Sequence, residues 1–497
     1  MSQKYIKRIS KSQYLKGLQC PLALWYYRHR PDLKPEIPPA KQALFDAGHE
    51  VGVLAQQYFQ GGVEITEPYY QIDQAIKSTH QAVAGSTAAI FEATACSDDG
   101  AYSRIDILKR VGPFDTWDLV EVKMSTGVKD YHMDDMALQR YAFRGAGYQI
   151  RKSILMHLNN QYVRFGDLDV EKFFTLENCT PAVSNRLSEV QANVAALIQM
   201  LNRVDEPVIA PGEQCYDPFE CDYTGHCIGP GPEFPVQNIF RPGRRLNTLL
   251  ADNILDVRDI PVGFDATERE RIAMEACRSN QVYTNRATIA DWLEQLEYPL
   301  YFLDYETINP PVPLFDNSRP FQQIPFQFSM HIQRTKGGAL EHAAFLHTDT
   351  SDPRPDLIRC LIDSCGTAGS LVVYNQAFEN RINNELGAAF PEFKDALNNI
   401  SDRMQDLLIP FRSRFIYHPQ MNGSASLKSV LPAFVSGLSY DDLAIRDGET
   451  ASLMYLNCIK DAVSDQEKTR IFQDLKTYCA LDTLAEVKLL EVLYGSI

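Results

Sequence analysis

The chain has 497 residues, of which 45% are hydrophobic and 23% are charged, and its formal net charge is -16 at pH 7. This length is too great for a single hydrophobic core, so two or three domains are expected. The negative charge excludes a uniformly basic coat for nucleic acid, and no apolar run approaches the roughly 20 residues that cross a bilayer. Residues 1–5 contain no apolar signal-peptide core, which predicts a cytoplasmic protein that does not use a membrane.

Four of the eleven cysteines form a pattern of their own. Cys215, Cys221 and Cys227 follow one another at equal spacing in a loop-rich segment of Gly, Pro and Asp that has no core of its own. Thiols of a cytoplasmic chain are not a disulfide framework, so we expect a bound metal to hold this segment. Cys20 is the expected fourth ligand, and a zinc site that includes His226 is the alternative.

Polar residues interrupt two strands that the apolar pattern predicts at residues 102–108 and 117–123. Asp106 lies in the middle of the first strand among apolar residues. Glu121 and Lys123 are two residues apart, so they share one face of the second strand. Buried acids beside a lysine predict a metal site with an ammonium group that positions or activates water. An ion pair across the face is the alternative.

Predicted helices carry further candidates. Ser12 is a plausible N-cap for the first helix. His49 lies in a helical pattern of apolar residues, where a lone histidine is either structural or a ligand. Gln139 and Tyr141 lie in a helix predicted at residues 130–143.

Residues 1–230 resemble the RecB-type PD-(D/E)XK nuclease superfamily, in the iron–sulfur form typical of CRISPR-associated exonucleases. The matching positions are Cys20, His49, Asp106, Glu121, Lys123, Gln139, Cys215, Cys221 and Cys227. The resemblance implies a [4Fe-4S] cluster on the four cysteines, and Mg²⁺ or Mn²⁺ on His49, Asp106 and Glu121. It also implies that Lys123 assists the attacking water and that Gln139 holds the active site or the substrate. Tyr141, on the same predicted helix, is a further candidate for substrate binding. The cysteine triplet is more open than in the tightest family forms, which leaves the cluster type open.

The middle of the chain differs in composition from both ends. Residues 228–235 are rich in Gly and Pro, which predicts a linker. Residues 246–296 show helical periodicity. We therefore expect a linker and a helical connector at residues 231–297, with a scaffolding role.

A second pair of acids follows an apolar, aromatic run. Residues 301–306 predict a buried strand, on which Asp304 and Glu306 point to the same face near its end. Two adjacent carboxylates repel each other unless a cation lies between them. Solvated acids on a surface strand are the alternative.

Further candidates follow along the chain. Asn375 and Glu379 lie where a predicted buried strand runs into a helix, and Asp406 lies in a stretch predicted to be helical at residues 400–411. Lys428 lies in the first turn of a capped helix. Tyr478 and Asp482 are four residues apart, so they share one face of a helix whose other residues are largely apolar.

Residues 298–497 resemble the DnaQ-like 3′–5′ exonucleases of the DEDD type, which have an RNase H fold. The matching motifs contain Asp304 and Glu306, then Asn375 and Glu379, then Tyr478 and Asp482, with Asp406 between the second and the third. The resemblance implies two divalent ions on the carboxylates, a water oriented by Tyr478, and substrate contacts from Asn375 and Lys428. Glu379 stands where the family usually has Asp. The block is also similar to the C-terminal domain of bacterial DUF2779 proteins that join the same two halves.

These patterns together predict a multi-domain α/β protein. A PD-(D/E)XK restriction-endonuclease-like core occupies residues 1–230, and an RNase H-like mixed sheet flanked by helices occupies residues 298–497. The expected function is metal-dependent hydrolysis of phosphodiester bonds, with DNA favoured over RNA as the partner. The alternative is a nucleic-acid-binding scaffold in which one or both centres are inactive.

Overall fold

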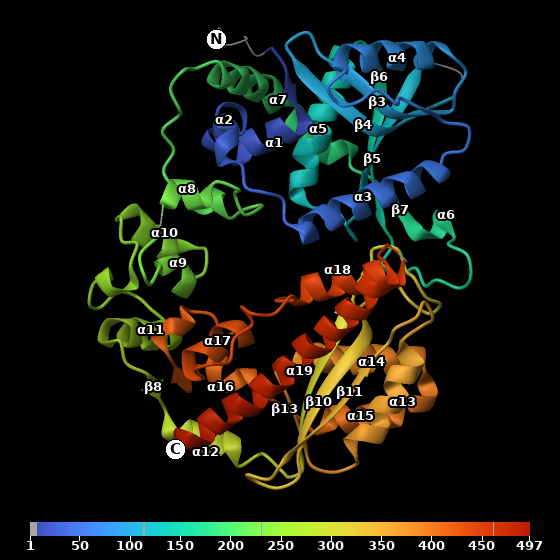
Figure 1. Cartoon of the computed structure of the whole chain (residues 1–497). Coiled ribbons are helices and arrows are strands. Elements are labelled where there is room, and N and C mark those ends of the chain that lie inside the picture. Colours follow the sequence, from blue (N-terminus) through green and yellow to red (C-terminus); the bar gives the residue numbers. More distant parts are fainter. Residues whose placement is uncertain (1–6, 113–114, 230, 461) are drawn as a thin grey trace. The chain divides into compact units, whose positions relative to one another are not determined.

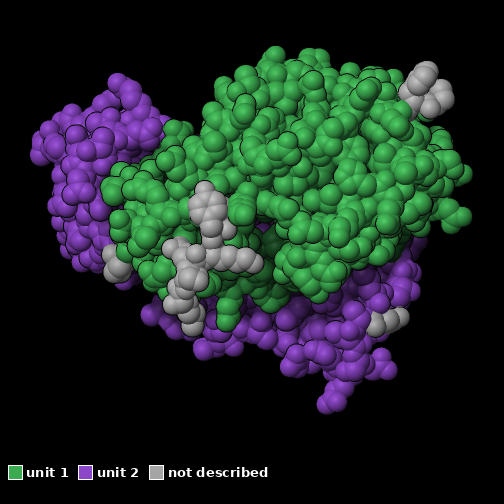
Figure 2. Space-filling view, turned by 90° about the horizontal axis from the view of Figure 1, so that it is seen from above, with its two compact units in different colours: residues 1–230, 310–321 green, residues 231–309, 322–497 purple. Residues whose placement is uncertain are grey.

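The computed structural model describes residues 7–112, 115–229, 231–460 and 462–497. The chain divides into two compact units, coloured separately in Figure 2. Unit 1 contains residues 1–230 and 310–321, and unit 2 contains residues 231–309 and 322–497. Both are α/β, with a mixed sheet and helices (Figure 1). No helix in the described ranges has the length and apolar character that crossing a membrane requires.

The sheet of unit 1 has seven strands in the order β2-β3-β4-β5-β6-β7, and β1 pairs with β4. The strands are β1 (Ile9–Ser10), β2 (Val63–Glu64), β3 (Ala89–Cys96), β4 (Ala101–Arg110), β5 (Thr116–Lys123), β6 (Gln149–Leu158) and β7 (Phe174–Asn178). Strands β3, β4 and β5 are antiparallel, whereas β5 and β6 are parallel and are joined by helix α5. The predicted strands that carry Asp106 and Glu121 are therefore confirmed, as β4 and β5.

Helices cover both faces of this sheet. They are α1 (Lys11–Gln19), α2 (Pro21–His29), α3 (Pro39–Gln57), α4 (Ile72–Ala84), α5 (Asp130–Gly145), α6 (Val170–Phe173), α7 (Thr180–Leu201) and α8 (Thr224–Ile228). Val120 packs with α3, and its neighbour Leu119 packs with Phe143 of α5. Because adjacent strand residues point to opposite faces, α3 and α5 cover opposite sides of β5.

The start of the first helix differs from the prediction. Ser10, and not Ser12, is the N-cap of α1, because its side chain accepts a hydrogen bond from Gln13 N and the Gln13 side-chain oxygen accepts one from the Ser10 amide. This reciprocal capping box satisfies two amides at the helix start. Lys11 thereby becomes the first residue of α1.

The main sheet of unit 2 has five strands in the order β11-β10-β9-β12-β13. They are β9 (Leu300–Ile308), β10 (Ile324–Gln333), β11 (Leu340–Leu346), β12 (Ser370–Val373) and β13 (Met404–Asp406). Strands β9, β10 and β11 are antiparallel, and β12 lies parallel to both β9 and β13. A separate pair joins β8 (Tyr283–Thr284) to β14 (Ile416–Tyr417).

The helices of unit 2 are α9 (Val236–Ile239), α10 (Arg244–Ala251), α11 (Glu268–Ser279), α12 (Arg286–Leu293), α13 (Arg354–Cys365), α14 (Gln376–Ala389), α15 (Lys394–Asp402), α16 (Leu408–Arg412), α17 (Leu427–Phe434), α18 (Gly448–Ile459) and α19 (Asp465–Gly495). Tyr301, Leu303 and Tyr305 of β9 pack in one core with α13, α14 and α15. The alternate residues of β9 point to the other face, against which α18 and α19 pack (Figure 1). This alternation places Asp304 and Glu306 beneath α19.

The helix predicted at residues 400–411 is wrong around Asp406. Helix α15 ends at Asp402, and Met404–Asp406 form strand β13, which pairs in register with Leu371–Val373 of β12. Three backbone pairings with the sheet and the burial of Met404 override a local sequence that also suits a helix.

A glycine in unit 2 provides a test of this packing. Gly423 has a φ of +81°, and a Cβ atom there would lie 1.9 Å from the carbonyl oxygen of Asn238. Gly423→Ala should lower the free energy of unfolding by about 2–4 kcal/mol, because left-handed strain and a backbone clash add. Gly437→Ala is the control, with a φ of +79° and open space around the added atom, and it should cost only about 1–2 kcal/mol. Urea denaturation measures both, and equal losses would contradict the close approach.

Candidate metal centres

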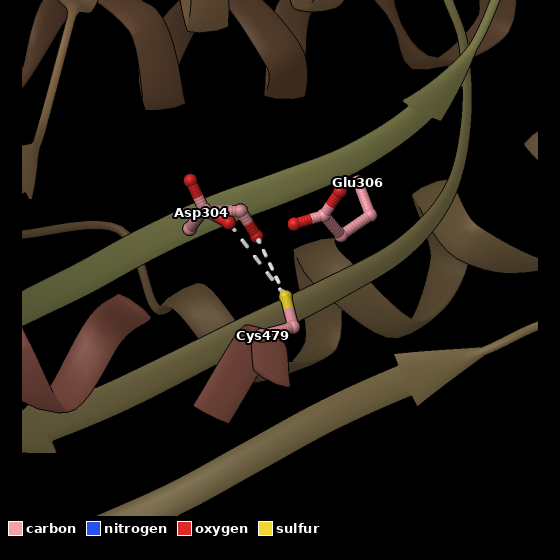
Figure 3. Close-up of side chains that lie close together, drawn as sticks. All are labelled: Asp304, Glu306 and Cys479. Atoms are coloured by element: carbon pink, nitrogen blue, oxygen red, sulfur yellow. Dashed lines mark hydrogen bonds between the residues drawn. The ribbon is translucent and has the colours of Figure 1, made fainter. Parts of the chain in front are cut away.

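Unit 2 brings three potential ligands together beside the second half of β9. Ligand atoms of Asp304, Glu306 and Cys479 lie within 4.8 Å of one another (Figure 3), and no other set of His, Cys, Asp or Glu in the described ranges is this tight. Cys479 Sγ lies 3.7 Å from Asp304 Oδ2 and 3.9 Å from the Asp304 carbonyl oxygen. A strand and the long helix α19 thus meet at one point.

Two hydrogen bonds from β10 fix α19 over these acids. Ser329 lies directly opposite Asp304 on the neighbouring strand, and its Oγ is 2.8 Å from Thr483 Oγ1 of α19. Gln327 lies opposite Glu306, and its Nε2 donates to the carbonyl oxygen of Leu475, 3.0 Å away. The cross-strand partners of both acids therefore hold the helix that carries Cys479 and Asp482.

Further carboxylates complete the group. Glu379 of α14 is 3% exposed and Glu486 of α19 is 0% exposed. Oε2 of Glu379 and both side-chain oxygens of Glu486 lack a hydrogen-bond partner within the described structure, although the Tyr374 backbone acts to lower the pKa of Glu486. Buried carboxylate oxygens without partners are costly unless a cation or a proton neutralises them.

The pKa shifts of these acids also indicate that a cation or a proton must neutralise them. Burial raises the pKa of each carboxyl group well above its usual range, and the charges of the neighbouring acids raise it further. This holds for Asp304, Glu306, Glu379 and Glu486. Lys428 of α17 partly offsets the effect at Asp304 and Glu306, but it is an exposed residue. With Asp482, five acids therefore lie near one exposed lysine, Lys428. Their carboxylate oxygens are ligands that a divalent cation prefers.

Two tyrosines flank Asp482. Tyr440 Oη donates a hydrogen bond to Asp482 Oδ1 at 2.6 Å. Burial raises the pKa of Asp482 to about 6, although Tyr440, Lys428 and Tyr478 act to lower it. The Nζ of Lys428 lies 5.7 Å from the ring centre of Tyr440 and 5.4 Å from that of Tyr478. Tyr478 is thus placed beside Asp482, as its spacing predicts.

Asn375 and Asp406 lie differently from the other expected residues. Asp406 Oδ1 accepts hydrogen bonds from the backbone amides of Asn375 at 3.2 Å and of Leu408 at 3.0 Å. These bonds hold the turns that follow β12 and β13. The Asn375 side chain is exposed, and its backbone has a φ of 114°.

Sequence reasoning missed three residues of this centre, Cys479, Glu486 and Tyr440. Cys479 directly follows Tyr478, but a lone buried cysteine gave no signal of its own. Glu486 lies four residues after Asp482, so an acid one helical turn further along an apolar helix was a usable signal. Tyr440 lies between α17 and α18, and nothing in its local sequence indicates that it reaches Asp482.

Unit 1 contains a second centre, built around Glu121 on the α5 face of β5. Glu121 Oε1 lies 2.6 Å from Lys123 Nζ and 2.6 Å from Lys11 Nζ. Lys123 Nζ also lies 2.7 Å from Asp135 Oδ2, and Gln139 Nε2 donates to Glu121 Oε2 at 2.6 Å. Burial would raise the pKa of Glu121, but the two ammonium groups hold it well below its usual range.

Asp106 lies at the edge of this network. Its Oδ2 accepts a hydrogen bond from the backbone amide of Val122 at 2.6 Å. Burial and the charge of Glu121 raise the pKa of Asp106, whereas Lys11 and Lys123 lower it. Sequence reasoning missed Lys11 and Asp135 here. Asp135 lies one helical turn before Gln139, which was a usable signal, whereas Lys11 is 110 residues from Glu121.

His49 and Tyr141 are not brought to this network. His49 is exposed on α3, whose buried residues pack against the face of β5 opposite to Glu121. Tyr141 Oη donates to Asp99 Oδ2 at 2.6 Å near the surface. It is two residues from Gln139, so on a helix the two side chains point in different directions.

The four expected cysteine ligands gather in unit 1. Cys20 and Cys215 are buried, and Cys221 N donates to the carbonyl oxygen of Cys215 at 2.9 Å. Burial raises the pKa of Cys227 to about 11, and the nearby thiols of Cys221, Cys215 and Cys20 raise it further. The His226 ring is exposed and meets the Tyr26 ring edge-on, with 5.1 Å between centroids.

Residues 301–426 match a protein family described as a domain of unknown function, DUF2779, which confirms that part of the resemblance. The chain is 23% identical over 243 residues to Uncharacterized protein MG366 of Mycoplasma genitalium, covering 45% of this chain and 36% of that protein. It is 24% identical over 232 residues to Uncharacterized protein UU173 of Ureaplasma parvum, covering 42% of this chain and 33% of that protein. The matches thus span about a third of each relative's length. No solved structure matches the chain at a comparable level of significance.

The carboxylates of unit 2 predict opposite effects of pH with and without a cation. The pKa of Asp482 is raised from an ordinary value of 3.8 to about 6, so the metal-free folded state binds more protons than the unfolded chain across this range. This contribution to stability is present at low pH and is lost as pH rises through about 6. A divalent cation competes with these protons, so the stabilisation by Mn²⁺ over EDTA should grow from about pH 5 to about pH 7.5, reaching about 2.7 kcal/mol at 100 times the Kd.

Thermal unfolding at both pH values with Mn²⁺ or EDTA measures this effect. Asp304→Asn/Asp482→Asn should remove most of it, whereas Asp291→Asn, at an exposed position of α12, should keep it. A Mn²⁺ effect that is independent of pH in the wild type would contradict cation binding by this group.

Proposed function

We propose that this protein is a metal-dependent nuclease with two active centres, which hydrolyses phosphodiester bonds of nucleic acid, with DNA favoured over RNA. The observation that carries the proposal is the group of four buried acids and the half-buried Asp304 in unit 2, which lies near one exposed lysine, Lys428. Such an excess of buried negative charge suits Mg²⁺ or Mn²⁺, which prefer oxygen ligands.

In the unit 2 centre, Asp304, Glu306 and Asp482 would hold the cations, with Glu379 as a further ligand. Cations bound there would activate a water molecule and stabilise the leaving oxygen. The Tyr478 and Tyr440 hydroxyls beside Asp482 would orient that water, and the exposed Lys428 would contact a phosphate. The order of the strands and the placement of the acids suit an RNase H-like exonuclease of the DEDD type.

In the unit 1 centre, Asp106 and Glu121 would hold a cation, and Lys123 would position the attacking water. Gln139 fixes Glu121 through its amide nitrogen, and its Oε1 atom is buried without a hydrogen-bond partner in the described structure, so it is available to a bound water. The antiparallel β3-β4-β5 strands, with α5 crossing to a parallel β6, suit a PD-(D/E)XK core. His49 and Tyr141 would have to move to take part.

The cysteines of unit 1 support a metal group of their own, in keeping with a cytoplasmic protein whose thiols stay reduced. Zinc in a tetrahedron with bonds of about 2.3 Å would hold the sulfur atoms about 3.8 Å apart. No three of these four thiols lie within 4.8 Å of one another, because the one such set in the described ranges is in unit 2. The wider spacing favours an iron–sulfur cluster, with zinc as the alternative.

One observation favours a binding scaffold as the second candidate function. Both oxygens of Glu121 already have partners, from two lysines and Gln139, so a cation must displace one of them. If no displacement occurs, unit 1 would bind nucleic acid without cleaving it.

Single substitutions separate the two activities. Asp304→Asn should lower cleavage by unit 2, and Glu121→Gln cleavage by unit 1, each by at least about 100-fold, because each removes charge that stabilises the transition state. End-labelled single-stranded and duplex DNA and RNA, incubated with Mg²⁺ or Mn²⁺, measure both. Asp291→Asn and Glu171→Gln, at exposed positions, are the controls. Wild-type cleavage by the double variant Asp304→Asn/Glu121→Gln would refute the assignment, and tight binding without cleavage by the wild type would favour the scaffold.

Metal analysis separates the two readings of the cysteines. Protein purified without oxygen should be brown and contain iron and acid-labile sulfide, and Cys20→Ser should lose most of both, because a cluster needs all four thiolates. Cys458→Ser, at a buried cysteine of α18, should keep them. Bound zinc without iron would identify the zinc site instead.

A further inference from the structure

The first helix of unit 1 carries a charged side chain that has no role in the function described so far. Lys11 Nζ lies 2.6 Å from Glu121 Oε1 and 3.6 Å from Asp135 Oδ1. We propose that Lys11 is a further active-centre residue, whose ammonium group takes the place of a divalent cation beside Glu121 and turns to a phosphate of the nucleic acid when the cation binds. This inference rests on the proposed nuclease function of unit 1.

The local structure aims Lys11 at the centre. Ile9 and Ser10 form the short strand β1, which pairs in parallel with Ala101 and Tyr102 at the start of β4. Ser10 then caps α1, so Lys11 is the first helical residue. The same strand that carries Asp106 therefore positions Lys11, and the ammonium group reaches Glu121 from a separate element of the chain.

The contacts indicate which lysine yields to a cation. Lys123 Nζ makes two short contacts, at 2.6 Å to Glu121 and 2.7 Å to Asp135. Lys11 makes one short contact, and its second one, to Asp135, is 3.6 Å long. Releasing Lys11 from Glu121 Oε1 thus breaks one short charged hydrogen bond. The side chains of Lys11 and Lys123 are 26% and 25% exposed, so the contacts, and not exposure, distinguish Lys11.

The charges of the centre explain why this exchange suits a phosphodiester. Asp106, Glu121 and Asp135 together carry three negative charges, and Lys11 and Lys123 carry two positive charges. The centre is thus one charge negative when Asp106 is ionised. A bound dication makes it one charge positive, and the single negative charge of a phosphodiester then balances it. Without Lys11 the centre would attract a cation more strongly and a phosphate less strongly, because the two ligands have opposite charge.

The opposite effects expected on cation affinity and on nucleic-acid affinity provide the test. In full-length Asp304→Asn protein, which removes a central ligand of unit 2, Lys11→Gln should raise the affinity for Mn²⁺ roughly tenfold, the size of effect that one neighbouring charge has on a buried acid. The affinity for a labelled single-stranded oligonucleotide in Ca²⁺ should fall, and the slope of its salt dependence should decrease by about one phosphate contact. Cleavage by unit 1 should fall about 10–100-fold. Electron paramagnetic resonance of free Mn²⁺ and fluorescence anisotropy measure the two affinities.

Three further variants keep the result interpretable. Lys77→Gln, at an exposed lysine of α4, should change neither affinity. Lys11→Arg keeps the charge and should retain oligonucleotide binding. Lys11→Gln/Asp135→Asn removes one charge of each sign and should return the Mn²⁺ affinity towards the wild-type value, which also tests the proposal if Lys11→Gln alone folds poorly.

The outcomes separate this inference from the proposed function. A purely structural Lys11 would lower both affinities or leave both unchanged, and either result would overturn the assignment. Another outcome is that the wild type binds Mn²⁺, and Lys11→Gln binds it more tightly, without cleavage of any substrate. In that case the nuclease proposal fails, but Lys11 still occupies the cation position beside Glu121. Unchanged cleavage by Lys11→Gln, with a normal salt slope, would remove the phosphate contact from the proposal.

Discussion

A buried carboxylate must be neutralised, and the two units meet this constraint in opposite ways. In unit 1, Lys11 and Lys123 share Glu121 Oε1, so the negative charge of Glu121 is balanced within the chain and its pKa is lowered. In unit 2, burial raises the pKa values of acids such as Glu486, and no ammonium group in the described structure is buried among them. The first centre is therefore complete as a folded network, whereas the second needs protons or cations from solution to be stable.

The two centres therefore affect the stability of the fold differently. In unit 2 the same interactions that would bind a cation are unfavourable without it, so the β9 acids are held in place by the surrounding structure. Ser329 and Gln327 of β10 provide that support by hydrogen bonding to α19. In unit 1 the ion pairs themselves join α1, β5 and α5. Binding of a cation there, as proposed, would be an exchange of partners and would cost more than filling a vacant ligand set.

Strands and shared faces could be predicted from the sequence where the pattern lies within a few neighbouring residues. Apolar patterns predict β4 and β5, and a continuous apolar, aromatic run predicts β9. The period of two then places Glu121 with Lys123, and Asp304 with Glu306, on shared faces. The prediction failed at Asp406, where pairing with β12 overrides the local helical pattern. Lys11 and Tyr440 were missed because 110 and 42 residues separate them from the acids they contact, and no periodicity links positions that only the fold brings together.

Helix α1 links two features of unit 1 that the sequence presents as independent. Lys11 at its start contacts Glu121. Gln19 at its end donates hydrogen bonds to the carbonyl oxygens of Gln214 at 2.9 Å and Phe219 at 2.6 Å, in the loop that carries Cys215 and Cys221. The helix has nine residues, so it spans about 13 Å between these contacts as one rigid element. A metal group bound by Cys20, Cys215, Cys221 and Cys227, as proposed, would hold this loop and with it the end of α1. It would therefore also stabilise the position of Lys11 at the start of the same helix.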